Sequence, residues 1–246
     1  MTTRPLVAVI VFPGSNDDRD AAWALGAMGA EPTLVWHEEE ELPPDTGAVV
    51  LPGGFSYGDY LRCGAIARLA AIMGAVKRFA AGGGPVLGIC NGFQILCEAR
   101  LLPGVLRPNH QLEFVCRDAP LLVENADTLF THRCSRGQRL VIPVKHGEGS
   151  WYADEGTFVG LAARGRIVLR YADDVNGSLG NVAGVVNDAG NVMGLMPHPE
   201  HAVDPLLGSA DGGLILAALV DAAAEHLRAP ARTADALAAQ APIASR

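Results

Sequence analysis

The stretch GPVLGICNGFQIL, from Gly84 to Leu96, is the most informative about the fold, because it joins a strand pattern to a helix pattern through a single turn. Pro85–Ile89 is a compact apolar run of strand length, and Asn91–Ala99 carries its apolar residues at helical spacing. Cys90 lies in the turn between the two, with a glycine two residues away on either side. The stretch therefore predicts a strand, a tight turn that holds a thiol, and a helix.

This turn has the pattern of a nucleophile elbow. In such an elbow, glycines permit a crowded turn between strand and helix that lifts the nucleophile toward solvent. The helix behind Cys90 offers unpaired N–H groups and a positive dipole end, which favour thiolate over thiol. The five residues Gly88–Gly92 fit a buried cysteine in an ordinary turn equally well, so a chemical role requires a suitable histidine elsewhere.

The first half of the chain repeats the alternation of strand and helix. Strand patterns at Leu6–Phe12, Thr33–Trp36 and Ala48–Leu51 alternate with helical patterns at Asp17–Met28 and Ala65–Ala81. Such alternation is typical of an α/β protein with a parallel, doubly wound sheet. We therefore predict a mostly parallel central sheet flanked by helices.

The pattern changes in the second half, between Leu112 and about Met196. Short β-rich runs are broken there by Gly, Asn and Asp turns, which predicts an antiparallel or mixed extension of the same sheet. An amphipathic helix from Asp211 to about Leu227 closes the pattern, so we interpret residues 1–227 as a single domain. Residues 228–246 form an Ala/Pro-rich tail that we expect to be poorly ordered. The five runs are LEFVC, RLVIPV, RIVLRY, NVAGVV and NVMGLM.

Composition limits the possible partners. Of 246 residues, 19 are Lys or Arg and 27 are Asp or Glu, so the net charge of −8 argues against a nucleic-acid partner. No segment approaches the roughly 20 apolar residues of a membrane span, which argues against a membrane protein. The five cysteines form no CxxC pair and are odd in number, as expected of reduced thiols in a cytoplasm. Apart from Cys90, they are expected to be small buried hydrophobes: Cys63, Cys97, Cys116 and Cys134.

Three segments that carry suggestive chemistry follow predicted strands. Cys90 follows one strand, the pair Gly53-Gly54 follows Ala48–Leu51, and the segment PHPE follows Asn191–Met196. Ligands of a parallel sheet sit at the carboxyl ends of its strands, because loops and helix N-termini converge there. If the three strand ends share an edge, they build one site.

His198 is the best candidate for a general base. Prolines on both sides restrict its backbone, and Glu200 follows two residues later, on the same side of an extended segment. A carboxylate in that place can orient the imidazole, as in a catalytic triad. A capped or core histidine is the alternative. A metal site made by His198, Glu200 and His201 is disfavoured, because the prolines exclude the helical HExxH geometry, and we predict no metal.

Other residues are candidates for binding the substrate. The N–H groups of Gly54 and Asn91 can form an oxyanion hole, although a plain tight turn at Gly53-Gly54 is as consistent with the local sequence. Gln94, one helical turn beyond the thiol, faces either substrate or solvent. The HGEG loop, which begins with His146 and Gly147, lines the pocket or forms a surface turn. The chain has no phosphate-binding GxxxxGK[ST] motif.

Taken together, these motifs resemble the class I glutamine amidotransferases. The resemblance rests on LPGGFSYGDYLRCGAIA (Leu51–Ala67), GICNGFQIL (Gly88–Leu96), HGEG and MPHPE, and it extends from about Leu6 to Leu227. It implies a flavodoxin-like amidotransferase fold, with Cys90 as nucleophile, His198 as base and Glu200 as the partner of the base. It also implies Gly54 and Asn91 for the oxyanion hole, with Gln94 and the HGEG loop near the substrate.

The longer motifs are most similar to the members of this superfamily that serve purine biosynthesis. The resemblance implies that L-glutamine is hydrolysed to glutamate and ammonia through a cysteinyl thioester. A separate synthetase subunit would use the ammonia, with ATP and Mg, to convert formylglycinamide ribonucleotide to formylglycinamidine ribonucleotide. A small accessory subunit would help to assemble this cytoplasmic complex. No cofactor is implied for the present chain.

The chain departs from the expected pattern at Asp17, where the GSNxD segment leads us to expect cysteine. We interpret Asp17 as lying off the triad and threatening none of its roles. Three alternatives remain open: an amidotransferase subunit of another pathway, a cysteine hydrolase of the same fold that acts alone, and a non-enzymatic binding module. The hydrolase would cleave peptides or thioesters as readily as glutamine. The binding module would tolerate loss of Cys90 and His198 alike.

Overall fold

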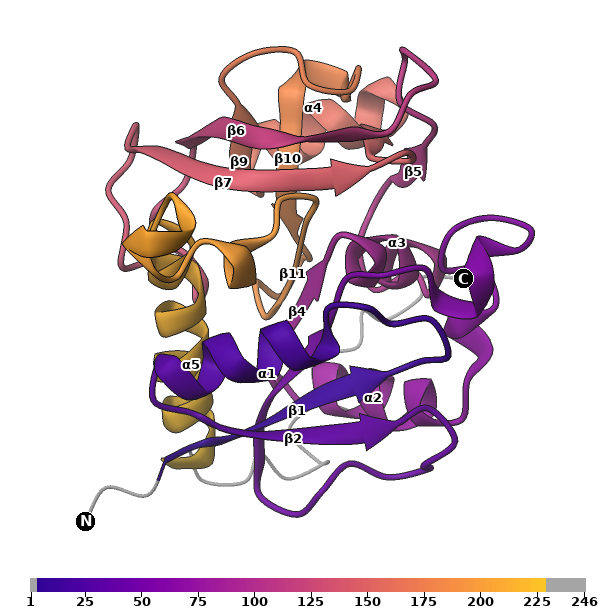
Figure 1. Ribbon diagram of the computed structural model, residues 1–246, viewed down its shortest axis with the longest axis vertical. Coiled ribbons are helices and arrows are strands. Elements are labelled where there is room, and N and C mark those ends of the chain that lie inside the picture. Colours follow the sequence, from indigo (N-terminus) through magenta and orange to yellow (C-terminus); the bar gives the residue numbers. More distant parts are fainter. Residues whose placement is uncertain (1–3, 229–246) are drawn as a thin grey trace, which may run out of the picture.

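A twisted sheet of nine strands runs through the part of the chain that the computed structural model describes, residues 4–228 (Figure 1). Its strands, in chain order, are β1 (Leu6–Val11), β2 (Glu31–Trp36), β3 (Thr46–Leu51), β4 (Val86–Ile89), β6 (Val115–Val123), β7 (Arg139–His146), β9 (Ile167–Tyr171), β10 (Val182–Val186) and β11 (Val192–Leu195). Their spatial order is β2-β1-β3-β4-β11-β10-β9-β6-β7. A separate two-stranded sheet pairs β5 (Val105–Arg107) with β8 (Ser150–Tyr152).

The sheet has a parallel part and an antiparallel part. β2, β1, β3, β4 and β11 are parallel to one another, whereas β10, β9, β6 and β7 pair antiparallel to their neighbours. All residues of β3 and β4 are buried, because helices cover both faces of this part of the sheet. The predicted α/β class, with a mostly parallel core and a mixed extension, is confirmed.

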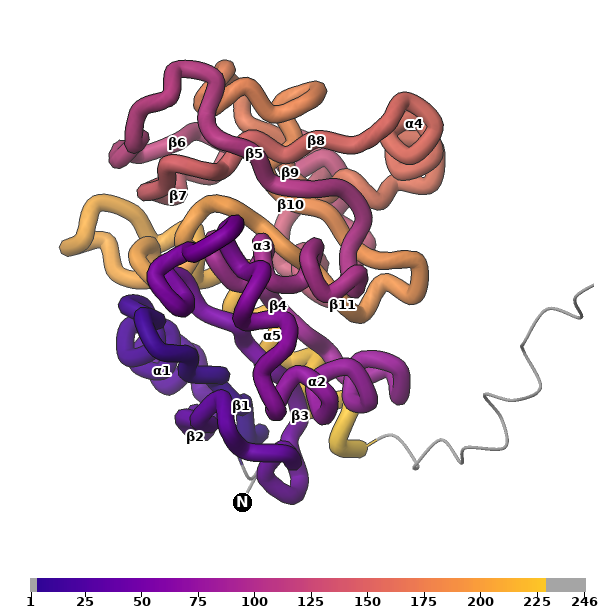
Figure 2. The backbone as a smooth tube through the Cα atoms, turned by 90° about the vertical axis from the view of Figure 1, so that its right-hand side faces the viewer, coloured from indigo at the N-terminus to yellow at the C-terminus, as the bar shows by residue number. Residues whose placement is uncertain are grey.

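Helices lie on both sides of the parallel strands (Figures 1 and 2). α1 (Asp18–Ala27) and α5 (Gly212–Arg228) contact each other and pack on one face, against β1 and β3. α2 (Ile72–Ala81) and α3 (Asn91–Glu98) lie on the other face, where α3 packs against β3, β4 and β11. α3 is thus held directly behind the strand end that carries Cys90.

The structure corrects several expectations for the second half of the chain. The run LEFVC is not itself a strand: β6 begins only at Val115, while Leu112 and Phe114 are exposed in the preceding loop. The later part of β6 is not predicted from the sequence, because charged residues and Pro120 interrupt the alternation of apolar and polar side chains. The run NVMGLM (Asn191–Met196) contains β11 and belongs to the parallel part of the sheet, since β11 pairs parallel with β4.

One helix was not predicted from the sequence, and one predicted helix is shorter than expected. In α4 (Glu155–Ala163), apolar residues surround the axis and only Leu161 is buried, so the helix lacks an amphipathic period. The sequence feature that indicates this helix is its N-cap residue, Asp154, whose side chain accepts a hydrogen bond from the Thr157 N–H. The helix expected at Ala65–Ala81 divides into a short 3-10 turn, η2 (Ala67–Leu69), and α2.

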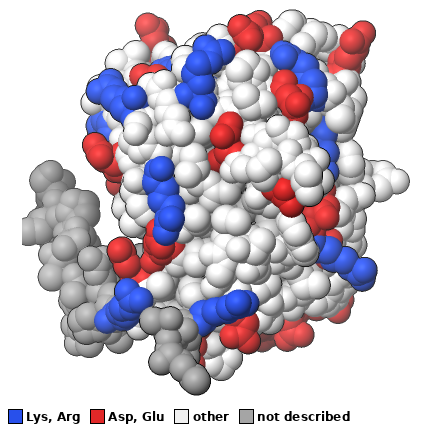
Figure 3. All heavy atoms as spheres, turned by 60° about the vertical axis from the view of Figure 1, so that its left-hand side comes forward, with Lys and Arg blue, Asp and Glu red and all other residues white. Residues whose placement is uncertain are grey.

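The remaining expectations have mixed outcomes. All five cysteines are free; Cys63, Cys97 and Cys134 are buried as predicted, but Cys116 is exposed on β6, so its predicted burial is wrong. Apart from Arg228, which ends α5, the predicted tail lies outside the described residues. No helix between residues 4 and 228 has both the length and the apolarity to cross a bilayer. On the face in Figure 3, basic and acidic side chains are interspersed.

Candidate active site

The three strand ends that carry the predicted chemistry lie side by side. β3, β4 and β11 are consecutive neighbours and run parallel, so the loops that follow them meet at one edge of the sheet. Gly54, Cys90 and His198 come from these three loops and line one pocket of about 300 Å³. The end of β7 and the HGEG loop form a further wall of this pocket.

Cys90 occupies the elbow in a strained conformation. Its backbone has φ 50° and ψ −104°, outside the regions that residues with a side chain normally adopt. Crowding explains how the strain is held: a Cβ on Gly92 would collide with the Leu51 carbonyl, and one on Gly88 would collide with the backbone of Gly92. The turn therefore points its thiol into the pocket, where Sγ lies 3.8 Å from the Lys145 carbonyl oxygen.

His198 and Glu200 form a buried pair. Nδ1 of His198 lies 2.7 Å from Oε1 of Glu200, and both side chains are almost fully buried. The segment is not extended, as the sequence suggested, because Pro199 begins a 3-10 turn, η4 (Pro199–His201). The turn nevertheless brings Glu200 back beneath the ring. Nε2 of His198 has no hydrogen-bond partner among the described residues, so it is available to groups in the pocket.

The charges around His198 favour its protonated form. Burial alone would lower the pKa of His198, but the negative charge of Glu200, together with the contribution of the neighbouring Cys90, outweighs burial and raises the pKa to about 10. A protonated imidazole next to an ionised thiol is the arrangement that activates a cysteine nucleophile. The pair can therefore deliver a thiolate for attack and a proton for a leaving group.

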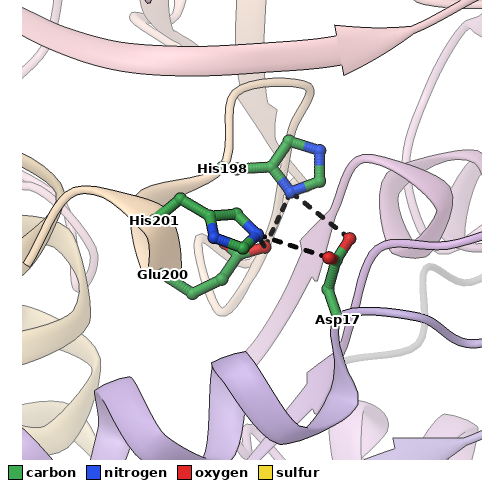
Figure 4. A group of neighbouring side chains, drawn as sticks. All are labelled: Asp17, His198, Glu200 and His201. Carbon is green, nitrogen blue, oxygen red and sulfur yellow. Dashed lines mark hydrogen bonds and ion pairs between the residues drawn. The ribbon is translucent and has the colours of Figure 1, made fainter. Parts of the chain in front are cut away.

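Asp17 lies beside this pair, contrary to the expectation that it lies off the triad (Figure 4). Its buried carboxylate places Oδ2 at 3.6 Å from Nδ1 of His198, and Oδ1 lies 2.5 Å from Nζ of Lys145 and 3.3 Å from Nε2 of His201. Burial would raise the pKa of Asp17, but the hydrogen bond from His201 and the charges of His198 and Lys145 hold it well below its usual range. The short sequence around Asp17 contains no signal of these contacts, which join three separate segments of the chain.

Asp17, His198, Glu200 and His201 bring their polar atoms within 4.8 Å of one another. Such a cluster raises the possibility of a metal site. In the structure, however, the Lys145 ammonium already supplies the positive charge next to Asp17, and Nδ1 of His198 is bonded to Glu200. These contacts make a network of ion pairs, and the absence of a metal stays a prediction.

A chain of hydrogen bonds connects three of the predicted motifs. The Asn91 side chain accepts a bond from the Ser56 N–H and donates one to Oε1 of Gln94 at 2.9 Å. Gln94 in turn donates to the Glu148 carbonyl oxygen at 2.7 Å. The loop after β3, the elbow helix and the HGEG loop are thereby held in one arrangement. Asn91 is almost fully buried, so its side chain supports the pocket from behind.

The other predicted binding residues divide into two groups. Gly54, Gln94, His146 and Gly147 line the pocket, whereas the α-carbon of Gly53 abuts the His198 ring, where a Cβ would collide. His146 is locked: Nδ1 lies 3.1 Å from Asn109 Oδ1 and Nε2 lies 3.4 Å from Asn176 Nδ2. Burial and the charge of His198 lower the pKa of His146 to about 4, so the ring is neutral and anchors the HGEG loop.

Two acidic side chains in the pocket were not among the predicted site residues. Asp59, in the loop after β3, and Glu148, in the HGEG loop, approach the same buried thiol, Cys63. Burial and the negative charge of Glu148 raise the pKa of Asp59. Two neighbouring acids are suited to an ammonium group, such as the α-amino group of an amino acid. Both lie inside motifs that the sequence singled out, GFSYGD and HGEG, but neither motif indicated which residue faces the pocket.

Comparison with known proteins agrees with this geometry. A model of the CobB/CobQ-like glutamine amidotransferase domain matches residues 4–211. The chain is 55% identical over 217 residues to phosphoribosylformylglycinamidine synthase subunit PurQ of Rubrobacter xylanophilus, covering 88% of this chain and 98% of that protein. It is 54% identical to the protein of the same name from Bradyrhizobium diazoefficiens, covering 89% and 97%. A chain in the structure of PurLQS from Thermotoga maritima matches with a TM-score of 0.83 and 44% identity, covering 89% and 99%.

Proposed function

Because this chain belongs to the family of CobB/CobQ-like glutamine amidotransferases, we propose that it releases ammonia from glutamine for a phosphoribosylformylglycinamidine synthase. The match covers nearly the full length of relatives that carry this name, so the proposal concerns the whole subunit. The observation that carries it is the meeting of Cys90, His198 and Glu200 in one pocket.

In the first half of the reaction, the Cys90 thiolate attacks the side-chain amide carbon of glutamine. The carbonyl oxygen becomes an oxyanion, which the N–H groups of Gly54 and Asn91 stabilise. The C–N bond then breaks, and His198 gives the proton on Nε2 to the departing ammonia. A glutamyl thioester on Cys90 and a neutral imidazole remain.

In the second half, water attacks the thioester carbon. Neutral His198 takes a proton from this water through Nε2, while Glu200 holds the proton on Nδ1 and stabilises the imidazolium that forms. The C–S bond breaks, glutamate leaves, and the thiolate and imidazolium are restored. The balance is one water consumed, with one glutamate, one ammonia and one proton released.

Substrate selection follows from the pocket walls. The α-ammonium group of glutamine lies between the carboxylates of Asp59 and Glu148, and Gln94 positions the wall that carries Glu148. His146 supports the same wall from behind. This arrangement favours a free amino acid over a glutamine residue inside a peptide, which has no ammonium group at that place.

The ammonia is used by a separate synthetase subunit that binds ATP and Mg, with a small accessory subunit in the complex. The structure of PurLQS from Thermotoga maritima, which contains a chain similar to this one, supports such an assembly. The division of labour also fits the sequence, which has no phosphate-binding GxxxxGK[ST] motif.

The test uses the chain co-purified with its synthetase and accessory subunits. We expect glutamate release from glutamine, and formylglycinamidine ribonucleotide when ATP and the acceptor are added. A glutamine-like diazoketone should label Cys90 and stop this release, with protection by glutamine but not by peptides. Cys116→Ala is the matched control, because it removes an exposed thiol outside the pocket. Labelling that peptides block, or release that survives labelling of Cys90, would overturn the proposal.

A further inference from the structure

We propose that the Asp17 carboxylate is a second electrostatic partner of His198, and that Lys145 limits its influence by neutralising part of its charge. The inference rests on the proposed function, because it concerns the same histidine. It assigns Asp17 as a positioning residue that acts through His198, at a position where the sequence pattern led us to expect cysteine. Two carboxylates, rather than one, then face the Nδ1 side of the ring.

The contacts support an electrostatic role. Oδ2 of Asp17 lies 3.6 Å from Nδ1 of His198, and its side chain is only 4% exposed, so water screens the attraction weakly. The distance is too long for the hydrogen bond that Glu200 makes at 2.7 Å. Asp17 therefore contributes charge, while Glu200 fixes the orientation of the ring (Figure 4).

The local backbone also directs Asp17 toward the ring. Asp17 is the N-cap residue of α1, where an aspartate usually accepts a hydrogen bond from the first turn, yet its side chain makes no such bond. The side chain is thus free to face His198. The backbone N–H of Asp17 donates a hydrogen bond to the Gly53 carbonyl oxygen at 3.3 Å, which holds the residue next to the loop after β3. Gly53 leaves room for the approach, because a Cβ there would meet both the Asp17 carboxylate and the His198 ring.

Other charged groups set the background for this effect. Lys145 lies 2.5 Å from Oδ1 of Asp17 and reaches it from β7, on the antiparallel side of the sheet. His201 lies 3.3 Å from the same oxygen. The titratable and charged groups around His198 are Glu200 and His201 from η4, Cys90 from the elbow, Asp17 from the start of α1, and Lys145 and His146 from β7.

The two partners should act with opposite sign. A carboxylate near the ring stabilises the imidazolium, so removing its charge makes His198 lose its proton at lower pH. Removing the lysine charge leaves Asp17 unneutralised, so His198 should keep its proton to higher pH. A purely structural ion pair predicts something different, because loss of either partner would disturb the site in the same direction.

The experiment compares Asp17→Asn and Lys145→Met in the complete complex. Two rates are measured against pH: glutamate release and alkylation of Cys90 by iodoacetate, read by peptide mass spectrometry. Iodoacetate is an anion that the imidazolium attracts, so both rates should fall as His198 loses its proton. The alkaline limb of each pH profile is the range in which the rate falls for this reason. We expect Asp17→Asn to move this limb to lower pH by about one pH unit. Lys145→Met should move it up.

Asp18→Asn is the matched control, since it removes the same charge one residue along the chain. The alkaline limb of its pH profiles should stay at the same pH as in the unmodified complex. Asp17→Ser, which also removes the charge and cannot ionise in this pH range, should shift the limb in the same direction and replaces Asp17→Asn if the asparagine variant does not fold. An unmoved limb in a folded Asp17 variant, or shifts of equal sign in the Asp17 and Lys145 variants, would overturn the inference. Absence of glutamate release in the unmodified complex would instead contradict the proposed function, and the alkylation profile would still test Asp17.

Discussion

The parallel and antiparallel parts of the sheet contribute differently to the pocket. The parallel strands β3, β4 and β11 end in loops that carry the groups proposed to react, and backbone constraints hold those groups in place. Cys90 is held by a strained elbow, and His198 by a 3-10 turn that begins with proline. The antiparallel part supplies the HGEG loop and Lys145, which reach the pocket through side-chain and carbonyl contacts.

Rigidity is therefore distributed unevenly around the pocket. Groups that form and break bonds need positions fixed to a fraction of an ångström, and short loops at buried strand ends provide that precision. A wall that admits a substrate and releases ammonia can be held by a few hydrogen bonds. The Asp17–Lys145 ion pair joins the two parts directly across the site.

The largest effect should come from the nucleophile itself. In the reconstituted complex, Cys90→Ala should reduce glutamine-driven formation of formylglycinamidine ribonucleotide at least about a thousandfold, because the thioester cannot form. Synthesis driven by ammonium salt should persist, since the acceptor chemistry belongs to another subunit. Both nitrogen sources are assayed on the same preparation. Loss of the ammonium-driven reaction in a folded, assembled variant would contradict this assignment of roles.

The base and its carboxylate partner should differ in importance. His198→Ala removes the proton carrier and should lower glutamine hydrolysis by about a thousandfold or more, whereas Glu200→Gln keeps the imidazole and should cost about a hundredfold. Asp17 still supplies one negative charge near the ring in the Glu200 variant. Steady-state glutaminase rates of the complex measure both. Equal, negligible effects would break the triad assignment.

Substitution of two glycines by alanine tests the difference in rigidity between the elbow and the HGEG loop. Gly92→Ala places a methyl group against the Leu51 carbonyl and should lower the free energy of unfolding by about 2 kcal/mol. Gly147→Ala, in the HGEG loop, meets only Phe114 at 3.8 Å and should change stability by less than about 0.5 kcal/mol. Denaturant unfolding of each variant provides the measurement. Similar losses of unfolding free energy in the two variants would contradict the proposed difference in rigidity between the elbow and the HGEG loop.

A smaller effect than that of Gly92→Ala should come from removing the hydrogen bonds that hold the HGEG wall of the pocket. Gln94→Ala removes the bonds to Asn91 and to the Glu148 carbonyl, so we expect KM for glutamine to rise about tenfold, equivalent to about 1.4 kcal/mol. Ammonium-driven synthesis should be unchanged. Gln138→Ala, in a turn where its Oε1 accepts a bond from the Ser135 N–H, is the control. An unchanged KM would show that the HGEG loop keeps its position without the hydrogen bonds of Gln94.

Much of this architecture could be predicted from short sequence segments. The strands β1, β3 and β4 are apolar runs of strand length, and α3 has a clear helical period, so their positions were predicted nearly to the residue. The elbow was predictable because a G-x-C-x-G turn needs its glycines for local steric reasons. β6 and α4 were not, because β6 mixes charged and apolar residues and α4 exposes apolar ones.

The fold class, the elbow at Cys90 and the pairing of His198 with Glu200 could be predicted without the structure, because each depends on patterns among residues close together in the chain. Three features could be found only in the folded chain: Asp17 faces His198, Lys145 reaches Asp17, and Asp59 and Glu148 lie close together in the pocket. These contacts join residues that are far apart in the sequence: Asp17 and Lys145 are separated by 128 residues and meet only when both parts of the sheet have formed. No local pattern records such a contact.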